Sequence, residues 1–584
     1  MRRPSPRPAS AGPNGGALLW LRMSSLRVSD LRLRWVAPYW SASSARTRMA
    51  GMNHDSHPSV GVGVGPVSFA ELRAVARDGA PVHLTDDALA AIARARAVVE
   101  ELAASETPVY GVSTGFGALA TRHIPAEMRA QLQRSLVRSH AAGSGPEVER
   151  EVVRGLMLLR LSTLATGHTG VRVETARLLA GLLEHGITPV VREYGSLGCS
   201  GDLAPLAHCA LALIGEGEVR DASGALLPAA DALAAVGLEP VELAAKEGLA
   251  LINGTDGMLG MLVLAIEDLR MLLRTADIAA AMSVEGQLGT DRVFAAELQA
   301  IRPHPGQARS AANLTALLAD SGVVASHRGP DCNRVQDAYS LRCSPQVHGA
   351  ARDTVEHAAT VATRELASAV DNPVVVFDDL GGRGTGGLGG GAPGRVESNG
   401  NFHGAPVAYV LDFLAIVAAD VASISERRTD RFLDKARNHG LPPFLADDPG
   451  VDSGHMIAQY TQAAIVSELK RLAVPASVDS IPSSAMQEDH VSMGWSAARK
   501  LRRSVDGLTR VVAIEVLTAA RALDLRRPLE PSPATGAVIG LLRGAGVAGP
   551  GPDRHLSPEI ETVVGLVSSG AVLHAAETVI GELS

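Results

Sequence analysis

Cysteine and aromatic residues are scarce in this chain. Phenylalanine, tryptophan and tyrosine make up 3% of the 584 residues, and the four cysteines are Cys199, Cys209, Cys332 and Cys343. They show neither the paired spacing of a zinc site nor the density of a secreted disulfide-stabilised domain. This cysteine usage favours the reducing cytoplasm and predicts no metal centre.

Basic charge and long apolar runs are also lacking. The formal net charge is -8, which argues against nucleic acid and anionic membranes as partners, because both require a basic face. Although 46% of the residues are hydrophobic, no charge-free run reaches the roughly eighteen apolar residues of a membrane span. A small-molecule ligand is therefore the default expectation.

Residues 1–65 differ in composition from the rest. They contain no lysine and hold three of the four tryptophans, Trp20, Trp35 and Trp40. The segment resembles a targeting peptide, since such peptides are rich in arginine and serine and poor in acids. The alternative, which we favour, is an upstream start codon chosen in error, with Met49 or Met52 as the true beginning. Either way, we expect residues 1–65 to lie outside the folded core.

From about residue 66 the pattern is predominantly helical. Apolar residues recur at three- and four-residue spacing over 243–273, 404–428 and 496–525, which predicts helices long enough to form a bundle. The glycine tract 381–394 lacks the Gly-Lys-Ser/Thr ending of a phosphate loop and the helix that should follow it. We predict a solvated loop there.

The stretch EYGSLGCSGDLAPLAH, residues 193–208, is too rich in glycine for a helix interior. A serine-hydrolase elbow would require Gly-x-Ser-x-Gly, and Asp202 stands where the last glycine should be. Two interpretations remain open from the residues alone. Ser200 is either a turn residue that forms local hydrogen bonds or the precursor of a group made from the backbone.

The second interpretation follows from backbone chemistry. If the chain folds back tightly here, the amide nitrogen of Gly201 can attack the carbonyl carbon of Cys199, and loss of water closes a five-membered ring. Loss of the Ser200 hydroxyl as a second water leaves an exocyclic methylene. The product is an electrophile that no standard side chain supplies.

The segment resembles the signature of the aromatic amino acid ammonia-lyase family, in which an Ala-Ser-Gly triplet followed by Asp-Leu-Ala-Pro forms a 4-methylidene-imidazol-5-one group. Cys199 replaces the alanine, but its side chain takes no part in ring closure. Further motifs in the family's order are VYGVSTGFG (109–117), SHAAG (139–143), KEGLALINGT (246–255), RPHPGQ (302–307), VQDAYSLRCSPQVHGA (335–350), DNP (371–373), GNFHGAPVA (400–408), SISERR (423–428) and QEDHVSM (487–493).

The resemblance implies a mainly α fold. We expect a long central helix bundle and a smaller mixed N-terminal part that carries the active-site loops. The corresponding regions are 66–270, with the prosthetic-group loop, and 271–584, with the bundle and the glycine-rich loop. The family also implies a homotetramer in which each site draws on three chains.

The resemblance also implies the site residues. Tyr110 matches the base at the β-carbon, His140 lines the pocket for the substrate ring, and Glu488 contacts that ring or assists proton transfer. Arg342 matches a clamp for the substrate carboxylate, and its spacing from Tyr339 places both on one face of a helical turn. The full set is catalytic Tyr110, Ser200, Tyr339 and Glu488, precursors Cys199, Ser200 and Gly201, and substrate-binding His140, Asn253, Gln336, Arg342 and Phe402. We expect His403 and His490 to support the site without binding a metal.

SHAAG and QEDHVSM resemble the histidine-specific branch of the family, which implies elimination of ammonia from L-histidine to give trans-urocanate, the first step of histidine degradation. Attack on the electrophile by the amine or by the imidazole ring remains open. The alternatives are a tyrosine- or phenylalanine-specific ammonia-lyase or aminomutase, and an inactive helical scaffold.

Three departures accompany Cys199. Ser162 replaces a usual asparagine, Asp256 a glutamine and Val370 a threonine. None is a residue with an assigned chemical role, so these departures affect local hydrogen bonding and leave the expected reaction unchanged.

A chain that starts at Met52 is predicted to fold, assemble and release ammonia from L-histidine like the full chain, because the preceding residues lie ahead of the first family-like residue. Light scattering and an ammonia assay on both chains check this. A shortened protein that fails to assemble or loses activity would refute it.

Overall fold

The computed structural model describes residues 58–105, 108–198, 201–329, Cys332, 335–377 and 394–584. The expectations for residues 1–57, for Cys199 and Ser200, and for the glycine tract up to residue 393 fall outside these ranges. Contacts among residues 56–584 form one compact unit. The predicted division at residue 270 falls inside a single helix, α9, and stays a prediction.

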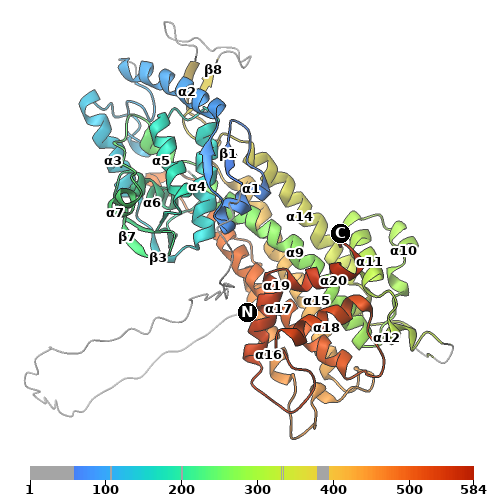
Figure 1. Ribbon diagram of the computed structural model, residues 1–584. Coiled ribbons are helices and arrows are strands. Elements are labelled where there is room, and N and C mark those ends of the chain that lie inside the picture. The colour runs from blue at the N-terminus through green and yellow to red at the C-terminus, as the bar shows by residue number, and fades with distance from the viewer. Residues whose placement is uncertain (1–57, 106–107, 199–200, 330–331, 333–334, 378–393) are drawn as a thin grey trace, which may run out of the picture. The chain divides into compact units, whose positions relative to one another are not determined.

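The N-terminal part mixes short strands and helices (Figure 1). Its helices are α1 Phe69–Arg73, α2 Asp86–Ala104, α3 Arg129–His140, α4 Arg150–Ala165, α5 Val173–Glu184, α6 Leu203–Leu213, α7 Ala229–Ala235 and α8 Glu247–Ile252. Its strands are β1 Val60–Val62, β2 Val82–Leu84, β3 Ser144–Glu147, β4 Thr188–Pro189, β5 Arg192–Tyr194, β6 Glu218–Arg220 and β7 Leu226–Pro228.

The strands form small separate sheets. β1 pairs with β2 in parallel, β3 is antiparallel to β5, and β4, β6 and β7 form an antiparallel ribbon in that order. Later in the chain, β8 Val374–Phe377 pairs antiparallel with β9 Gly394–Glu397, with Val374 opposite Glu397. These sheets join the ends of helices and do not form the main core.

Long helices dominate the rest of the unit, which confirms the predicted mainly α fold with a helix bundle (Figure 1). They are α9 Asp256–Gly286, α14 Ser344–Leu366, α15 Ala405–Leu433, α16 Met456–Leu472 and α17 Gly494–Asp524. Shorter helices pack around them: α10 Ala296–Ala300, α11 Pro305–Leu317, α12 Gly322–Ala325, α13 Tyr339–Arg342, α18 Pro533–Gly544, α19 Ser557–Ser568 and α20 Ala571–Ile580.

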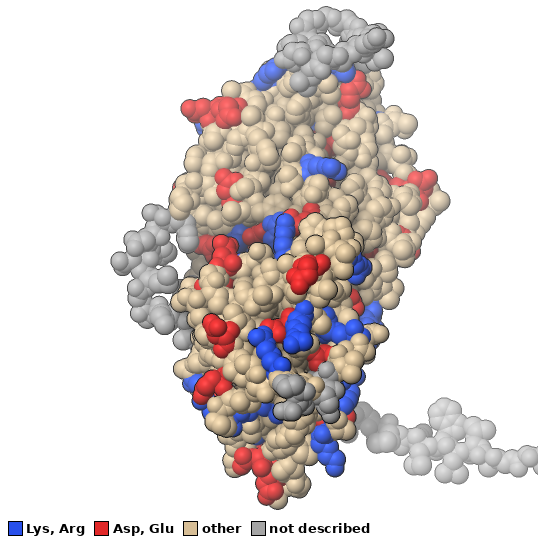
Figure 2. All heavy atoms as spheres, turned by 90° about the vertical axis from the view of Figure 1, so that its right-hand side faces the viewer, with Lys and Arg blue, Asp and Glu red and all other residues tan. Residues whose placement is uncertain are grey.

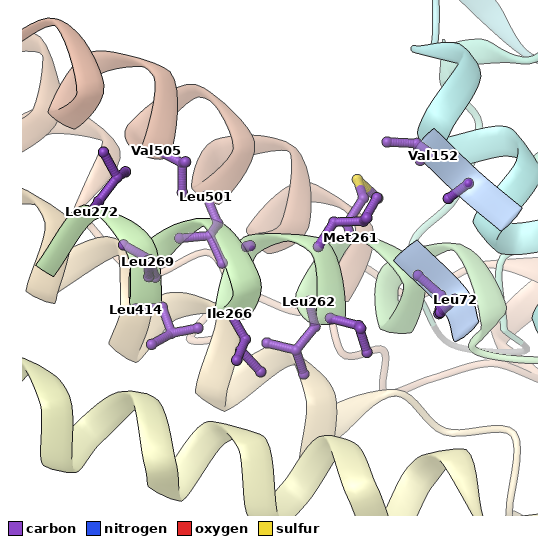
Figure 3. Close-up of a cluster of buried hydrophobic side chains, with 14 of the residues drawn as sticks. Leu72, Val152, Met261, Leu262, Ile266, Leu269, Leu272, Leu414, Leu501 and Val505 are labelled. Atoms are coloured by element: carbon purple, nitrogen blue, oxygen red, sulfur yellow. The ribbon is translucent and has the colours of Figure 1, made fainter. Parts of the chain in front are cut away.

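The bundle core lies along α9. Leu262, Ile266 and Leu269 of this helix point into a cluster that Leu414 of α15 and Leu501 of α17 complete (Figure 3). All five are completely buried, and burying a leucine or isoleucine side chain contributes about 1.5–3 kcal/mol to folding. The three helices are therefore held together along their length by apolar burial.

The predicted helix over 243–273 is wrong in two respects: it begins only at Glu247, and it is not continuous. Residues 253–255 interrupt it, so that α8 ends at Ile252 and α9 begins at Asp256. Gly254 has no room for a side chain, because a Cβ there would collide with the guanidinium of Arg160. The interruption creates the loop that carries Asn253.

Two segments are long and apolar enough to span a membrane by length and composition, residues 247–286 and α15. The most apolar window of the first is completely buried within the protein, and 61% of the second window is buried. The first segment is thus used entirely in packing within the protein, whereas part of the apolar surface of α15 stays exposed.

Candidate active site

The loop that contains the serine segment is attached to two distant parts of the chain. The carbonyl oxygen of Gly198 accepts hydrogen bonds from Gly404 N (3.1 Å) and Ser492 Oγ (2.7 Å). Met493 N donates to Leu197 O at 2.9 Å. The loop therefore joins the segment after Phe402 to the segment after Glu488, although these lie about 200 and 290 residues further on.

Gly201 makes a close backbone contact with Gly254. Its φ is +78°, in the left-handed region that favours glycine, and a Cβ would collide with backbone atoms of Gly254. Asp202 N donates to Gly254 O at 2.7 Å. The third residue of the predicted triplet is thus held in a tight turn against the loop that carries Asn253.

Asp202 fixes this turn to the start of α9. Its Oδ2 accepts from Gly257 N and Met258 N, both at 2.9 Å, and its Oδ1 accepts from Ser196 Oγ at 2.9 Å. The carboxyl group is completely buried, and burial raises its pKa to about 7. Free amide N–H groups at a helix N-terminus are natural partners for a carboxylate.

Asn253, next to Gly254 in the chain, carries a buried acceptor that has no partner among the described residues. Its Nδ2 donates to Asn372 O at 3.1 Å, whereas its Oδ1 is buried and finds no hydrogen-bond partner among the described residues. A buried polar atom without a partner is costly. Together with the close approach at Gly201, this unpaired oxygen fits a site built for a group formed from residues 199–201.

Arg160 of α4 holds the Asn253 loop in place. Its Nη1 donates to Ala250 O (2.9 Å) and Asn253 O (3.0 Å), and its Nη2 donates to Asp256 Oδ2 (2.6 Å) and Val370 O (3.0 Å). Arg160 is 2% exposed and Asp256 4%. Asp256, a departure from the family pattern, thus supplies the counter-charge for a buried arginine.

Tyr110 lies in the turn after α2 and is half-buried. Its hydroxyl oxygen accepts from Gly117 N at 3.4 Å. Burial raises the pKa of the phenol, and the nearby carboxylates of Glu488 and Asp371 add to the shift. Asp371 itself pairs with the completely buried Lys246, Nζ to Oδ2 2.6 Å.

His140 and Glu488 share this region with Tyr110. His140 ends α3, and burial lowers its pKa, with the charge of Glu488 acting in the opposite direction. A Cβ on Gly117 would lie 3.6 Å from Glu488 Oε1. Glu488 Oε2 is buried and unpaired in the described part of the chain, so it is available to a ligand.

Phe402 is half-buried. It lies two residues before Gly404, whose N–H donates to Gly198 O. The neighbouring His403 stacks on His490, with ring centroids 5.8 Å apart, and its Nε2 lies 3.3 Å from His490 O. A cavity of about 690 Å³ lies alongside, lined in part by Asn401, His403 and Glu365. We call Tyr110, His140, Asn253, Phe402 and Glu488 the loop cluster.

The remaining predicted residues form a separate group, the α13 cluster of Gln336, Tyr339 and Arg342. Tyr339 and Arg342 occupy one turn, with the guanidinium carbon 4.7 Å from the ring centroid, as their spacing predicts. Tyr339 is 72% exposed. Gln336 is exposed too, and Arg342 Nε is buried with no hydrogen-bond partner among the described residues.

The two clusters lie at opposite ends of α9. Asn253 precedes its first turn, whereas the α13 cluster is linked to its last turns through Arg428, Glu515 and Ser283. At 1.5 Å per residue, the 27 steps from Asp256 to Ser283 span about 40 Å. One chain therefore does not bring all the predicted site residues together.

Sequence comparison identifies the family. The family model described as aromatic amino acid lyase matches residues 67–544. The chain belongs to this family. The histidine ammonia-lyase of Streptomyces avermitilis is 65% identical over 90% of this chain and 100% of its own length. That of Streptomyces griseus is 64% identical with the same coverage.

Solved structures of aromatic amino acid lyases and aminomutases share the fold. A tyrosine aminomutase from Streptomyces globisporus superposes with a TM-score of 0.82 at 37% identity and covers 90% of this chain and 99% of its own. The histidine ammonia-lyase of Trypanosoma cruzi has a TM-score of 0.79 at 38% identity, over 89% of this chain and 95% of its own.

Sequence reasoning assigned no role to Arg160, Asp202, Lys246 or Asp371. Arg160 is a single charge within the apolar run LMLLRLSTLA, and such a charge in a buried helix needs a partner. That signal predicts a buried ion pair without identifying Asp256. Among the residues that the structure describes, no group of three or more His, Cys, Asp or Glu could hold a metal ion.

Replacing Arg160 by methionine is predicted to lower the free energy of unfolding by about 3–5 kcal/mol, because Asp256 is left buried without a counter-charge. Asp256→Gln should cost less, since the amide oxygen still accepts from Arg160. Denaturant titration of the two variants checks the ranking. Equal stability of Arg160→Met and the unmodified protein would contradict this role for Arg160.

Proposed function

We propose that this chain is a histidine ammonia-lyase, a carbon–nitrogen lyase that eliminates ammonia from L-histidine to give trans-urocanate. The proposal rests on the loop cluster, in which the phenol of Tyr110 and the imidazole of His140 both lie near the carboxylate of Glu488. The histidine ammonia-lyases at 64–65% identity support the same substrate. This elimination would be the first step of histidine degradation.

The runner-up is a tyrosine or phenylalanine ammonia-lyase or aminomutase, and the likeness to a tyrosine aminomutase favours it. That enzyme is 37% identical, well below the histidine ammonia-lyases. A neutral imidazole can donate at one nitrogen and accept at the other. His140 and the unpaired Glu488 Oε2 suit the substrate's imidazole ring better than an apolar or phenolic one.

The residues around Gly201 fit a methylidene-imidazolone group made from Cys199, Ser200 and Gly201. The backbone of Gly254 packs directly against Gly201, which holds the turn tightly folded, and Asn253 Oδ1 is buried without a hydrogen-bond partner among the described residues. Formed there, the group supplies an electrophilic carbon that activates either the amine or the imidazole ring. No external cofactor or metal is included in the proposal.

In this proposal Tyr110 removes the β-proton. Burial raises the pKa of its phenol in the isolated chain, which opposes that role, so the assembled site has to add positive charge. Arg342 supplies a permanent cation, since guanidinium stays protonated in proteins. Its planar fork would hold the substrate carboxylate through two parallel hydrogen bonds.

Arg342 reaches such a position only from another chain, because about 40 Å of α9 separates the two clusters. An apolar face on α15 supports assembly: Tyr409, Phe413 and Ile416, at four- and three-residue spacing, are 53%, 48% and 46% exposed. We propose a homotetramer in which each site draws on three chains, one of which supplies the loop cluster and another the α13 cluster.

We also propose that the enzyme acts on a small molecule in the cytoplasm and has no nucleic acid or membrane partner. On the face drawn in Figure 2, basic and acidic side chains are interspersed. The net charge of -8 also disfavours a polyanionic partner.

One prediction of the proposed function concerns the electrophile. Ser200→Ala should fold and assemble but be nearly inactive, whereas Cys199→Ala should keep the group and most activity, since residue 199 contributes only its carbonyl. Loss of one ordinary hydrogen bond would cost about 1 kcal/mol, or less than about tenfold. Intact mass, which falls by two waters when the ring forms, and urocanate absorbance check both variants. A fully active Ser200→Ala variant, or an unmodified protein whose mass shows no loss of two waters, would reject the prosthetic group. The remaining explanations would then be an inactive scaffold or a different chemistry.

Another prediction of the proposed function concerns recognition of the substrate ring. His140→Leu should lower histidine turnover and raise any trace activity on phenylalanine, because a buried ring nitrogen without a partner costs about 1–3 kcal/mol. Steady-state kinetics with both amino acids measure the selectivity. An unchanged ratio of kcat/KM values would show that His140 does not contact the imidazole ring.

A further inference from the structure

The carboxylate of Glu515 on α17 is completely buried and has four donors. Arg428 of α15 binds it side-on, with Nε on Oε1 and Nη2 on Oε2. Ser283 Oγ of α9 donates to Oε1 at 2.7 Å, and Ser425 Oγ of α15 donates to Oε2 at 2.6 Å. One carboxylate thus links the three central helices of the bundle.

The third nitrogen of Arg428 connects this ion pair to α13. Its Nη1 donates to Ser340 O and to Ser344 Oγ, both at 3.3 Å. Ser340 lies inside the Tyr339–Arg342 turn, and Ser344 opens α14 directly behind it. Ser344 Oγ in turn donates to Ser340 O at 3.2 Å.

A four-residue helix needs such external support. Nucleating a single turn is unfavourable, and a helix this short does not persist on its own. Within the chain, Leu341 anchors one side of the turn in the core, whereas Tyr339 on the other side is mostly exposed and adds little to its orientation. A guanidinium that binds a carboxylate through two bonds also has to be held within about 0.5 Å of its productive position.

We propose that Glu515 and Arg428 are positioning residues for the reaction, which hold α13 so that Arg342 meets the substrate carboxylate in the neighbouring chain's site. The inference rests on the proposed function. Glu515 fixes the guanidinium, and the guanidinium fixes the Ser340 carbonyl between the two site residues. Neither residue contacts the substrate.

The competing explanation is that the pair only stabilises the bundle. The two explanations separate when the charges are removed together, because an apolar pair of similar volume can restore the stability of a buried ion pair. It cannot restore the hydrogen bond to Ser340. In the double variant, the hydroxyl groups of Ser283 and Ser425 can instead donate hydrogen bonds to backbone carbonyls of their own helices.

The test uses the full-length assembled protein. Glu515→Gln leaves a buried cation without its counter-charge, so it should unfold at lower denaturant and show a KM for L-histidine raised about tenfold or more, the effect of weakening one charge-assisted hydrogen bond. Arg428→Met/Glu515→Leu should recover most of the stability but keep the raised KM. Inhibition by histamine, which lacks the carboxylate, should change less than about twofold, because a shift of about 0.4 kcal/mol lies within the scatter of neutral substitutions.

Asp277→Asn is the matched control. Asp277 is also a fully buried carboxylate with several donors, among them Arg352 and His348, and among the described residues no hydrogen bond links these two side chains to α13. This variant should lose stability with an unchanged KM. If the double variant has the KM of the unmodified enzyme, or if Asp277→Asn raises KM equally, the positioning role is overturned.

Ser344→Ala keeps the test decisive if the double variant does not fold. It removes one of the two acceptors of Arg428 Nη1 and leaves the ion pair intact, so KM should rise about threefold, while an unchanged KM would contradict the proposal. Intact mass and light scattering on each variant establish that the prosthetic group and the tetramer are retained. Absence of urocanate with the unmodified protein would instead reject the proposed function.

Discussion

The backbones of Gly201 and Gly254 contact each other, and this contact determines the geometry of the candidate site. Two chain segments can approach this closely only where both lack a Cβ. The approach sets where α9 begins, because Asp202 both donates to Gly254 O and accepts from Gly257 N and Met258 N. It also explains the interruption at residues 253–255, because a continuous helix could not bring the Gly254 backbone against Gly201. A bundle of continuous helices would lose this site.

Helix α9 then keeps the loop cluster and the α13 cluster of one chain at a fixed separation. Its apolar face packs against α15 and α17 along its length, and its two ends each carry a buried ion pair, Arg160 with Asp256 and, through Ser283, Arg428 with Glu515. Buried pairs of this kind add little net stability compared with apolar packing. Their use here is geometric, since each guanidinium holds carbonyl oxygens of a loop or turn that bears predicted site residues.

Much of this could be predicted from the sequence, and the limits have physical causes. Periodicity predicts α15 and α17 to within a few residues, because each has one continuous buried face. It does not predict the break at 253–255, since the apolar pattern continues through it. Single charges in apolar runs, Arg160 and Glu515, indicate buried pairs but not their partners, because pairing depends on helix packing. The motifs predict Tyr110, His140 and Glu488 together, which the structure places around Gly117. They do not reveal that Tyr339 and Arg342 lie about 40 Å away along α9.

A high-resolution crystal structure of the assembled protein can decide whether a group made from the backbone lies at the Gly201 turn in a site shared between chains. We expect density for a five-membered ring at residues 199–201, with Asn253 Oδ1 in contact with it and Arg342 of a neighbouring chain facing Tyr110. An open peptide with the Ser200 hydroxyl intact, or an Arg342 that faces solvent in the complete assembly, would contradict it.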